Sequence, residues 1–462
     1  MSQAEYRSQI ERIRQLINQG ELEEAENILA RLEETLQGVA VEKEITIDIL
    51  NEKGKIHFRR GNYTAAKQLL EKALIKAREG EPYEFGKATA IHYIGATMWN
   101  LGEADGALEL YEQALSIRRK IGDERGAAAT IHNIAMCQSK RGNIQEAFSL
   151  YKEALEIKRK LKDDVGIVRT LSNIGAIYRR MGHFSKAMEY LRQAQELAQE
   201  IGLKQGEILV DHNIGVISWA QGNITDAKQR LLNCATYWHQ KNIQNTLFAS
   251  VLRDLAEMGA ELEEFDEAEE HLAKLNEMAA RYSSSIISCY ASYSNGAVAK
   301  AKGNVASALK AFENSLSLAQ RHKMFELEMK SLVQLAEMHL FEFRLSMDEE
   351  NLEKTQEYIN EAKKASIERN HAYALIESSI VNGMLMAAGM NFHAAEAELT
   401  QAVLASKEQN LPIQEKKAEM QLAKVKKLHT RADRMIKPPE IEEQVEEIKS
   451  YLNKYAKALK GL

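Results

Sequence analysis

The stretch LSNIGAIYRRMGHFSKAMEYLRQAQELAQEIG, residues 171–202, decides the fold. Its apolar residues recur at helical spacing on both sides of Gly182, which predicts two amphipathic helices joined by a tight turn. Small residues at Gly175, Ala187 and Ala194 allow the two helix backbones to approach closely. A hairpin of this size cannot bury its apolar stripe alone, so it needs copies of itself on both sides.

The chain supplies these copies at a nearly constant interval. The position of Ala187 recurs every 40 or 41 residues, except for one interval of 47 residues. We therefore expect ten helix pairs over residues 5–410, with turns near residues 20, 61, 102, 142, 182, 222, 263, 303, 350 and 390. The positions equivalent to Ala187 are Ala25, Ala66, Ala107, Ala147, Ala227, Ala268, Ala308, Thr355 and Ala395.

The order of small, aromatic and small residues in each unit resembles the tetratricopeptide repeat. The long period and linkers such as KIGDERG (120–126) and KLKDDVG (160–166) resemble the variant found in kinesin light chains and Pins-type polarity adaptors. This resemblance implies an all-α, right-handed superhelical solenoid whose first helices line a concave surface. A solenoid is one quasi-linear body, so the roughly three globular domains suggested by 462 residues are not expected.

Two regions depart from the regular repeat. The 47-residue interval contains seven extra residues, which we place in LFEFRLSMDEENLE (340–353). Seven residues are almost two helical turns, so a longer first helix is expected, and a tolerated insertion is favoured over a partner-specific feature. Residues 411–462 are expected to form C-terminal capping helices, the first over 411–437 and the second over about 440–459.

The first of these capping helices is basic, with eight Lys or Arg between Lys416 and Lys437. It is either a weak contact for a membrane surface or an acidic partner, or a solvated cap that docks through its apolar residues. The second alternative is favoured. The apolar residues expected to dock are Met420, Val425, Leu428 and Ile436.

Composition excludes several classes of function. The net charge of −6 over 462 residues argues against a general nucleic-acid binder. No run approaches 18 apolar residues, so no transmembrane segment is expected, and the N-terminus lacks the apolar core of a signal peptide. Three scattered cysteines fit a reducing cytoplasm better than a disulfide framework.

No catalytic or cofactor-binding motif is present, and we expect a non-catalytic protein without cofactors. Phosphate-loop and dinucleotide glycine patterns are absent, because the glycines occupy repeat turns. His92, His132 and His212 share one repeat position, but no matching carboxylate or thiol accompanies them. A zinc site needs three or four converging ligands, so a histidine row along the groove is preferred to a metal site.

The strongest candidate for ligand contact is a ladder of Asn133, Asn173 and Asn213, continued by Asp254, Ser294 and Gln334. Asparagine is a mediocre helix former, and its amide can both donate to and accept from a peptide backbone. In kinesin light-chain and Pins-type repeats, asparagines at this position hold peptide backbones, so the resemblance implies the same here. The alternative is hydrogen bonding between neighbouring helices.

The same groove is expected to have a basic centre. This centre consists of Arg169, Arg179, Arg180 and Lys140, with His132 and His212 beside it. Trp99 and Trp219 share one repeat position and are expected to flank it as anchors for apolar side chains, packing between helices being the alternative. Beyond residue 250 the groove becomes more mixed, with Glu257 and Glu261 beside Arg253.

These observations predict a cytoplasmic interaction scaffold or adaptor that binds an extended, partly acidic and apolar segment of a protein or peptide in its concave groove. The alternative is a peptide-sensing regulatory protein whose superhelix changes shape when ligand binds. An enzyme would require a catalytic constellation that the sequence lacks. The sequence shows neither the coiled coil of kinesin light chains nor the additional motifs of Pins-type adaptors, so only the general peptide-binding role is carried over.

Overall fold

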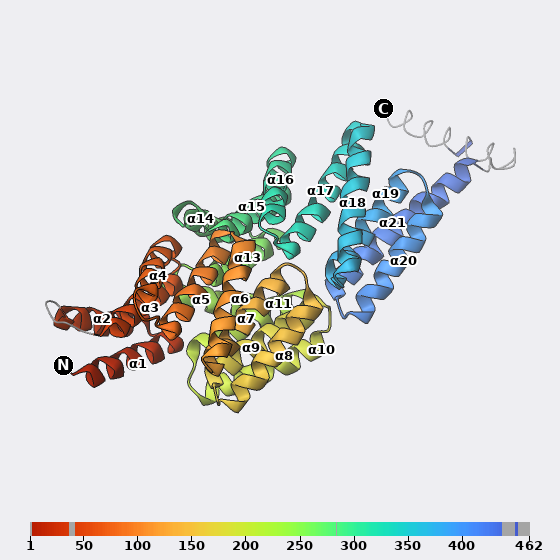
Figure 1. Ribbon diagram of the computed structural model, residues 1–462. Coiled ribbons are helices and arrows are strands. Elements are labelled where there is room, and N and C mark those ends of the chain that lie inside the picture. Colours follow the sequence, from red (N-terminus) through yellow and green to blue (C-terminus); the bar gives the residue numbers. More distant parts are fainter. Residues whose placement is uncertain (1, 37–41, 283, 437–448, 451–462) are drawn as a thin grey trace.

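The computed structural model describes residues 2–36, 42–282, 284–436 and 449–450. Helices hold 86% of these residues, and no strand occurs among them. The helices stack as antiparallel pairs along a curved, elongated body (Figure 1). The predicted all-α superhelical solenoid is confirmed.

The first helices of the pairs carry odd numbers and the second helices carry even numbers. The first helices are α1 Gln3–Gln19, α3 Lys43–Arg60, α5 Glu84–Leu101, α7 Glu124–Lys140, α9 Asp164–Arg180, α11 Lys204–Ala220, α13 Thr246–Glu261, α15 Ser285–Ala301, α17 Phe325–Ser346, α19 Ala372–Ala388 and α21 Pro412–Ile436. The second helices are α2 Leu22–Leu36, α4 Tyr63–Arg78, α6 Ala104–Lys120, α8 Ile144–Lys160, α10 Phe184–Glu200, α12 Ile224–Gln240, α14 Phe265–Arg281, α16 Val305–Arg321, α18 Glu349–Glu368 and α20 Phe392–Glu408.

The hairpin of α9 and α10 shows how the small residues act. Gly182 lies between the two helices with φ of 80°, a left-handed conformation that glycine adopts without steric cost. Gly175 lies beneath Leu191, and a Cβ atom at Gly175 would stand 2.8 Å from Leu191 Cγ. Ala187 and Ala194 are completely buried. The small residues therefore permit the close helix approach that the sequence predicts.

The extra residues of the ninth repeat lengthen its helices. Helix α17 has 22 residues and α18 has 20, whereas α15 and α16 have 17 each. The expected longer first helix is confirmed. Its end is apolar and exposed at Leu345 and Met347.

Successive turns of the superhelix touch along what we call the seam. At the seam, the glycine turn inside a repeat contacts a linker 183 to 228 residues further along the chain. Ser284 and Ser285 each donate a hydrogen bond of 2.8 Å, to the carbonyl oxygens of Asn100 and Leu101 respectively. The approach is so close that a Cβ atom at Gly61 would lie 2.1 Å from the carbonyl oxygen of Gln244.

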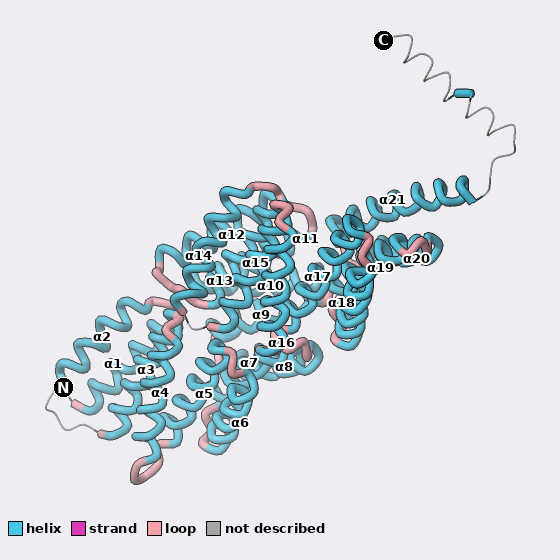
Figure 2. Tube along the Cα trace, turned by 90° about the horizontal axis from the view of Figure 1, so that it is seen from above, coloured by secondary structure: helices cyan, strands magenta, loops and turns pink. Residues whose placement is uncertain are grey.

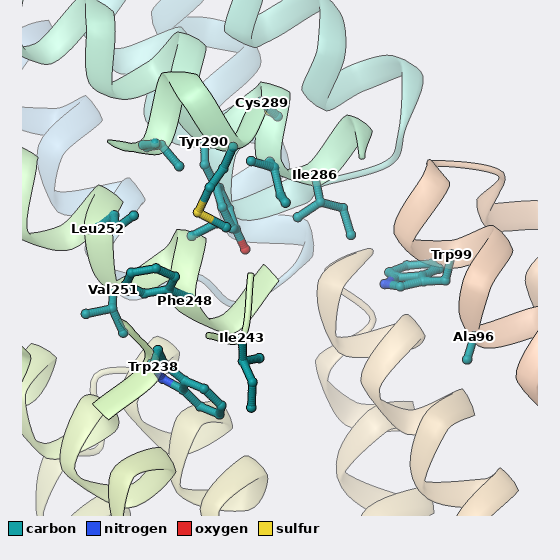
Figure 3. Packing of buried hydrophobic residues seen from close by; sticks show 14 of the residues in the cluster. Ala96, Trp99, Trp238, Ile243, Phe248, Val251, Leu252, Ile286, Cys289 and Tyr290 are labelled. Carbon is teal, nitrogen blue, oxygen red and sulfur yellow. The ribbon is translucent and has the colours of Figure 1, made fainter. Parts of the chain in front are cut away.

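The seam also has an apolar part, which surrounds Trp99. This side chain on α5 is only 5% exposed and belongs to the same hydrophobic cluster as Ile286 and Tyr290 of α15. Figure 3 shows Trp99 pointing toward Ile286. The seam thus adds tertiary contacts between segments that a linear stack of repeats would hold apart.

Helix α21 docks on the last repeat and extends outward from the C-terminal end of the solenoid (Figure 2). Ala418 and Val425 are buried in the core, as expected for Val425. The expectation that Met420 and Leu428 dock is wrong: both are about half exposed, because they lie on the other side of the helix. The side chain of Ile436, Lys437 and the second capping helix lie outside the described residues.

The described residues lack two further features. Within them, no helix is long and apolar enough to cross a membrane. The same part of the chain holds no group of three or more His, Cys, Asp or Glu side chains placed to bind a metal ion. The three cysteines, Cys137, Cys234 and Cys289, are all buried and free.

Candidate ligand-binding cavity

A cavity of about 460 Å³ lies inside the second half of the superhelix. Its wall is built by first helices, from α9 through α11, α13, α15, α17 and α19 to α21, with a small contribution from the start of α10. Cavities of about 300–1,000 Å³ are the usual size for ligand sites in proteins. The apolar part of the wall includes Val216, Trp219, Ala297, Met329, Val333 and Ile413.

The remaining wall is dominated by charged side chains. Six lining residues are Arg or Lys, and five are Asp or Glu. The cations are Arg179, Arg180, Arg253, Lys300, Lys330 and Lys417, and the acids are Asp254, Glu257, Glu261, Glu326 and Glu377.

Several of these charges neutralise each other across helix boundaries. Arg253 binds Asp254 at 2.6 Å on its own helix, and its guanidinium lies 4.7 Å from the ring centre of Tyr290. Lys330 of α17 reaches Glu257 of α13 at 3.0 Å. Because the Lys330–Glu257 pair joins two first helices, it fixes the shape of the wall as well as its charge.

Lys417 makes a similar connection at the other side of the cavity. It binds Glu377 of α19 at 2.8 Å and lies 3.7 Å from Glu337 of α17. Burial opposes the charge on Lys417, but the adjacent carboxylates Glu337 and Glu377 dominate and raise its pKa. The first turns of α21 therefore complete the wall rather than only covering the last repeat.

Four polar groups at the cavity lack such partners among the described residues. Glu261 makes no hydrogen bond or ion pair there, and burial together with Glu257 raises its pKa to about 7. Arg179 Nε and His371 Nε2 are buried without a hydrogen-bond partner. Glu326 accepts no hydrogen bond, although Arg179 and Arg180 overcome the effect of burial and hold its pKa well below the usual range.

The structure brings part of the predicted site to this cavity. Arg179, Arg180 and Trp219 line it. Glu257 and Glu261, from the part of the groove predicted to carry both signs of charge, line it as well. The basic centre predicted from the sequence is thus present at one end of the cavity, although two of its four members lie elsewhere. Whether these side chains bind a ligand stays a prediction.

The asparagine ladder does not line the cavity. Asn133 donates to His92 Nε2 at 3.2 Å, and Asn173 donates to His132 Nε2 at 3.1 Å. Asn213 donates to Ser172 Oγ at 3.1 Å. Each amide therefore bridges to the first helix of the preceding repeat, which is the alternative stated above. The contacts that the structure shows are therefore between helices, and the contact of the ladder with a peptide stays a prediction.

The histidine row lies in the same layer and is likewise not a lining row of the cavity. His132 Nδ1 stands 3.0 Å from Thr170 Oγ1, and burial lowers the pKa of His132 well below its usual value. His212 Nε2 lies 2.7 Å from Asp254 Oδ2. The histidines thus occupy hydrogen-bonded places between neighbouring helices.

Three other predicted site residues make contacts across the interior or the seam. Arg169 donates to the carbonyl oxygen of Asn18 at 3.0 Å, and burial, with Arg59 nearby, lowers its pKa. Lys140 Nζ reaches Tyr290 Oη at 3.4 Å. Trp99 is buried in the seam, so the expectation that it flanks the basic centre is wrong; the superhelix closes over it.

Sequence reasoning missed most of the cavity residues beyond α13. They include Lys300, Glu326, Lys330, His371, Tyr373, Glu377 and Lys417. A register signal was available for some of them, because Lys330 and Glu377 occupy the repeat position of Arg169, and Lys300 occupies that of Arg179. Following charged residues at these positions through all repeats would have extended the candidate groove to α19.

The family comparison agrees with the repeat geometry. The sequence model of the tetratricopeptide repeat matches residues 45–120, 86–160 and 126–200. Residues 45–200 therefore match the tetratricopeptide repeat. A comparison with curated protein sequences gave no match.

Several solved structures resemble the fold of this chain. The Rap conjugation gene regulator of plasmid pLS20, solved with the Phr* peptide, is 13% identical, with a TM-score of 0.52 over 78% of this chain and 96% of that chain. A Rap protein complexed with competence and sporulation factor is 13% identical, with a TM-score of 0.47 over 93% and 99%. TPR-like repeats assigned to a kinesin light chain of Podospora anserina are 20% identical, with a TM-score of 0.32 over 44% and 99%.

Proposed function

We propose that this protein is a non-catalytic scaffold or adaptor that holds an extended protein or peptide segment in the cavity of its second half. The observation that carries the proposal is a cavity walled by seven consecutive first helices, with both an apolar surface and unpaired polar groups. A cavity of about 460 Å³ accepts a short stretch of chain and excludes a folded domain. Its free and buried thiols suit the cytoplasm as the place of action.

The solved structure of the pLS20 regulator supports a peptide as the class of ligand. The pLS20 regulator shares the solenoid and was solved in complex with a peptide. We extend to this chain only the general property that such a solenoid holds an extended segment. The charged wall, with six cations and five acids, further indicates a ligand that carries charge itself.

A capture experiment with a blocked cavity tests the proposal. Ala301 lines the cavity and its side chain is exposed to it, so Ala301→Trp fills space without displacing the core. Ala306, exposed on the second helix of the same repeat, provides the control Ala306→Trp. Tagged parent and variants are used as bait, and bound proteins and peptides are identified by mass spectrometry. Partners shared by parent and control but lost with Ala301→Trp support the proposal, and equal recovery by all three contradicts it.

The peptide-sensing alternative is supported by one observation: the cavity is shared by helices at both ends of a superhelical turn. Arg180 on α9 and His371 at the start of α19 line the same space. A ligand that binds both would alter the spacing of the turn, because only a ligand with different affinity for two shapes can shift their populations. Small-angle scattering with and without a captured peptide tests this alternative, which requires a change in radius of gyration.

A further inference from the structure

One end of the cavity holds polar groups that face each other without touching. His371 precedes α19, and its Nδ1 accepts a hydrogen bond of 3.2 Å from the backbone N–H of Ala374. The proton of the neutral ring is therefore on Nε2, which becomes a donor. This donor is buried and has no partner in the described part of the chain, and the side chain is only 6% exposed.

Two guanidinium groups lie at the same end. Arg180 donates to the carbonyl oxygen of Ser139 at 3.0 Å and makes no ion pair within the described residues. Arg179 Nε is buried without a partner. All four groups line the cavity, and the ring of His371 lies 5.8 Å from that of Phe325, the neighbour of Glu326 in the chain. Both arginines also act electrostatically on Glu326 and on His371. We call Arg179, Arg180, His371 and Glu326 the basic corner.

The charge balance of the basic corner selects its ligand. Two arginines and one carboxylate leave a net charge of about +1, since the nearby Arg253 and Lys330 are already paired. A carboxylate supplies the matching single negative charge, and arginine binds this planar group through paired hydrogen bonds. A dianionic phosphate would add a second charge against Glu326 and Glu257, so it is disfavoured.

The far part of the cavity has the opposite character. Glu261 ends α13 and has no partner, with Glu257 on its own helix and Glu377 on α19 as acidic neighbours. The facing groups on the other helices are Lys330 of α17, Lys417 of α21, and the hydroxyls of Tyr293 on α15 and Tyr373 on α19. Lys417 and Lys330 are both engaged with other carboxylates. Glu261 is therefore the carboxylate left for a cation.

Resting on the function proposed above, we propose that the cavity binds a dipolar peptide segment, with a carboxylate in the basic corner and an ammonium or guanidinium group at Glu261. Helix α19 indicates the spacing, because His371 in the basic corner and Glu377, an acidic neighbour of Glu261, are six residues apart, which is about 9 Å along a helix. An extended chain spans this distance with about three residues. The carboxylate is the C-terminus of a peptide or an acidic side chain within one, and these two sources are separated below.

Synthetic tripeptides of this length test the proposal with the full-length protein. Trialanine carries a charge at each end, trialanine amide lacks the carboxylate, and acetyl-trialanine lacks the cation. Acetyl-Lys-Ala-Glu-amide carries both charges on side chains. Affinities are measured by isothermal titration. We expect removal of either charge to weaken binding about tenfold or more. Stronger binding of trialanine identifies terminal groups as the source, and stronger binding of the side-chain peptide identifies an internal segment.

Three variants assign each charge to its place. Arg179→Gln is expected to weaken the acid-bearing probes about tenfold while leaving the amide unchanged, and Glu261→Gln to weaken only the probes that carry a cation. His371→Asn keeps a side-chain acceptor for the N-terminus of α19 but removes the Nε2 donor, so it separates the cavity role from helix capping. Arg192→Gln, at an exposed position on α10, is the matched control, and melting curves verify folding.

The dipolar site is overturned if the amide binds as tightly as the acid, or if Arg179→Gln and Glu261→Gln leave all affinities unchanged. It is also overturned if no dipolar probe binds the parent at millimolar concentration. In that last case the proposed scaffold function is still tested independently, by the capture experiment with Ala301→Trp.

Discussion

The inward-facing sides of α7 and α9 differ from those of α13, α17 and α19, although all five are first helices of the same type of repeat. In α7 and α9, Asn133 and Asn173 bind histidines of the preceding first helix. In the later helices, Glu261, Glu326 and Nε2 of the neighbouring His371 face a cavity and have no hydrogen-bond partner among the described residues. Satisfied buried polar groups stabilise a fold, whereas unsatisfied ones cost free energy and indicate a site for something else. The earlier interior is therefore structural, and the later one is the candidate site.

The largest effect is expected from the asparagine ladder. Replacing Asn133, Asn173 and Asn213 together by Ala leaves a partner unsatisfied at each position, which costs about 1–3 kcal/mol each. Alanine's better helix propensity returns up to about 0.7 kcal/mol each. We expect a net loss on the order of 5 kcal/mol, seen as a lower melting temperature by circular dichroism. Asn233→Ala on the exposed face of α12 is the control. A triple variant that melts with the parent would return the ladder to the groove.

Two glycine variants compare a repeat turn that touches the seam with one that does not. Gly61 and Gly303 both have positive φ, but only Gly61 has the later superhelical turn against it, with Gln244 O 2.1 Å from a Cβ atom. Gly303→Ala is expected to lower the free energy of unfolding by about 1–2 kcal/mol, because alanine is strained in the left-handed conformation. Gly61→Ala adds about 1–3 kcal/mol for the steric conflict. Urea unfolding measures both, and equal costs would show that the seam gives way freely in solution.

Replacing the unpaired carboxylate of Glu261 is expected to change stability by a smaller amount, and the change should depend on pH. The pKa of Glu261 is raised from 4.5 to about 7. The folded state therefore holds this proton more tightly than the unfolded state, so stability falls as pH rises from about 4.5 to 7 and the penalty is complete above 7. Glu261→Gln removes the penalty, and we expect its melting temperature to exceed that of the parent by a degree or two at pH 8.

The same variant should differ little from the parent at pH 4.5, where the carboxylate is protonated in both states. The exposed Glu200→Gln on α10 is the control and should show no such trend. A Glu261→Gln protein that is less stable than the parent at pH 8 would mean that this carboxylate has a structural partner.

The smallest effect is expected at the exposed edge of the seam. Lys323 binds Asp105 at 2.7 Å, and the hydrogen bonds from Lys323 and Arg141 lower the pKa of Asp105. Exposed ion pairs contribute at most about 1 kcal/mol, and salt screens them. Lys323→Gln should lower stability by no more than this amount at low salt and by nothing measurable in about 1 M salt. A larger or salt-independent loss would mean that this pair, and not the glycine contacts, holds the seam.

Much of the fold was predictable because repeat signals are local. The turn at Gly182 and the small residues Gly175 and Ala187 depend on contacts within one hairpin, which recur at fixed spacing. The longer α17 followed from an interval in the register for the same reason. The docking of Met420 and Leu428 was not predictable in this way, because a terminal helix lacks the next repeat that would select its buried face.

The candidate site was predictable only in part. Arg179 and Trp219 share one repeat position that faces inward, Arg180 follows Arg179 directly, and all three line the cavity. The same rule pointed to Trp99, which the seam buries. Repeat position determines which side of the solenoid a residue faces, but not whether a neighbouring helix or a later turn already occupies that side.

The amino-acid sequence by itself determined the helix pairs and their order, since both depend on periodicity and on neighbours close in the chain, and the family resemblance implied that the first helices face inward. Only the tertiary structure decided where the interior remains open. Ser284 approaches Asn100 across 184 residues, and Lys417 meets Glu337 and Glu377 on α17 and α19. Small rotations per repeat add up over several repeats before such groups meet. The cavity therefore results from superhelical closure, which no single repeat specifies.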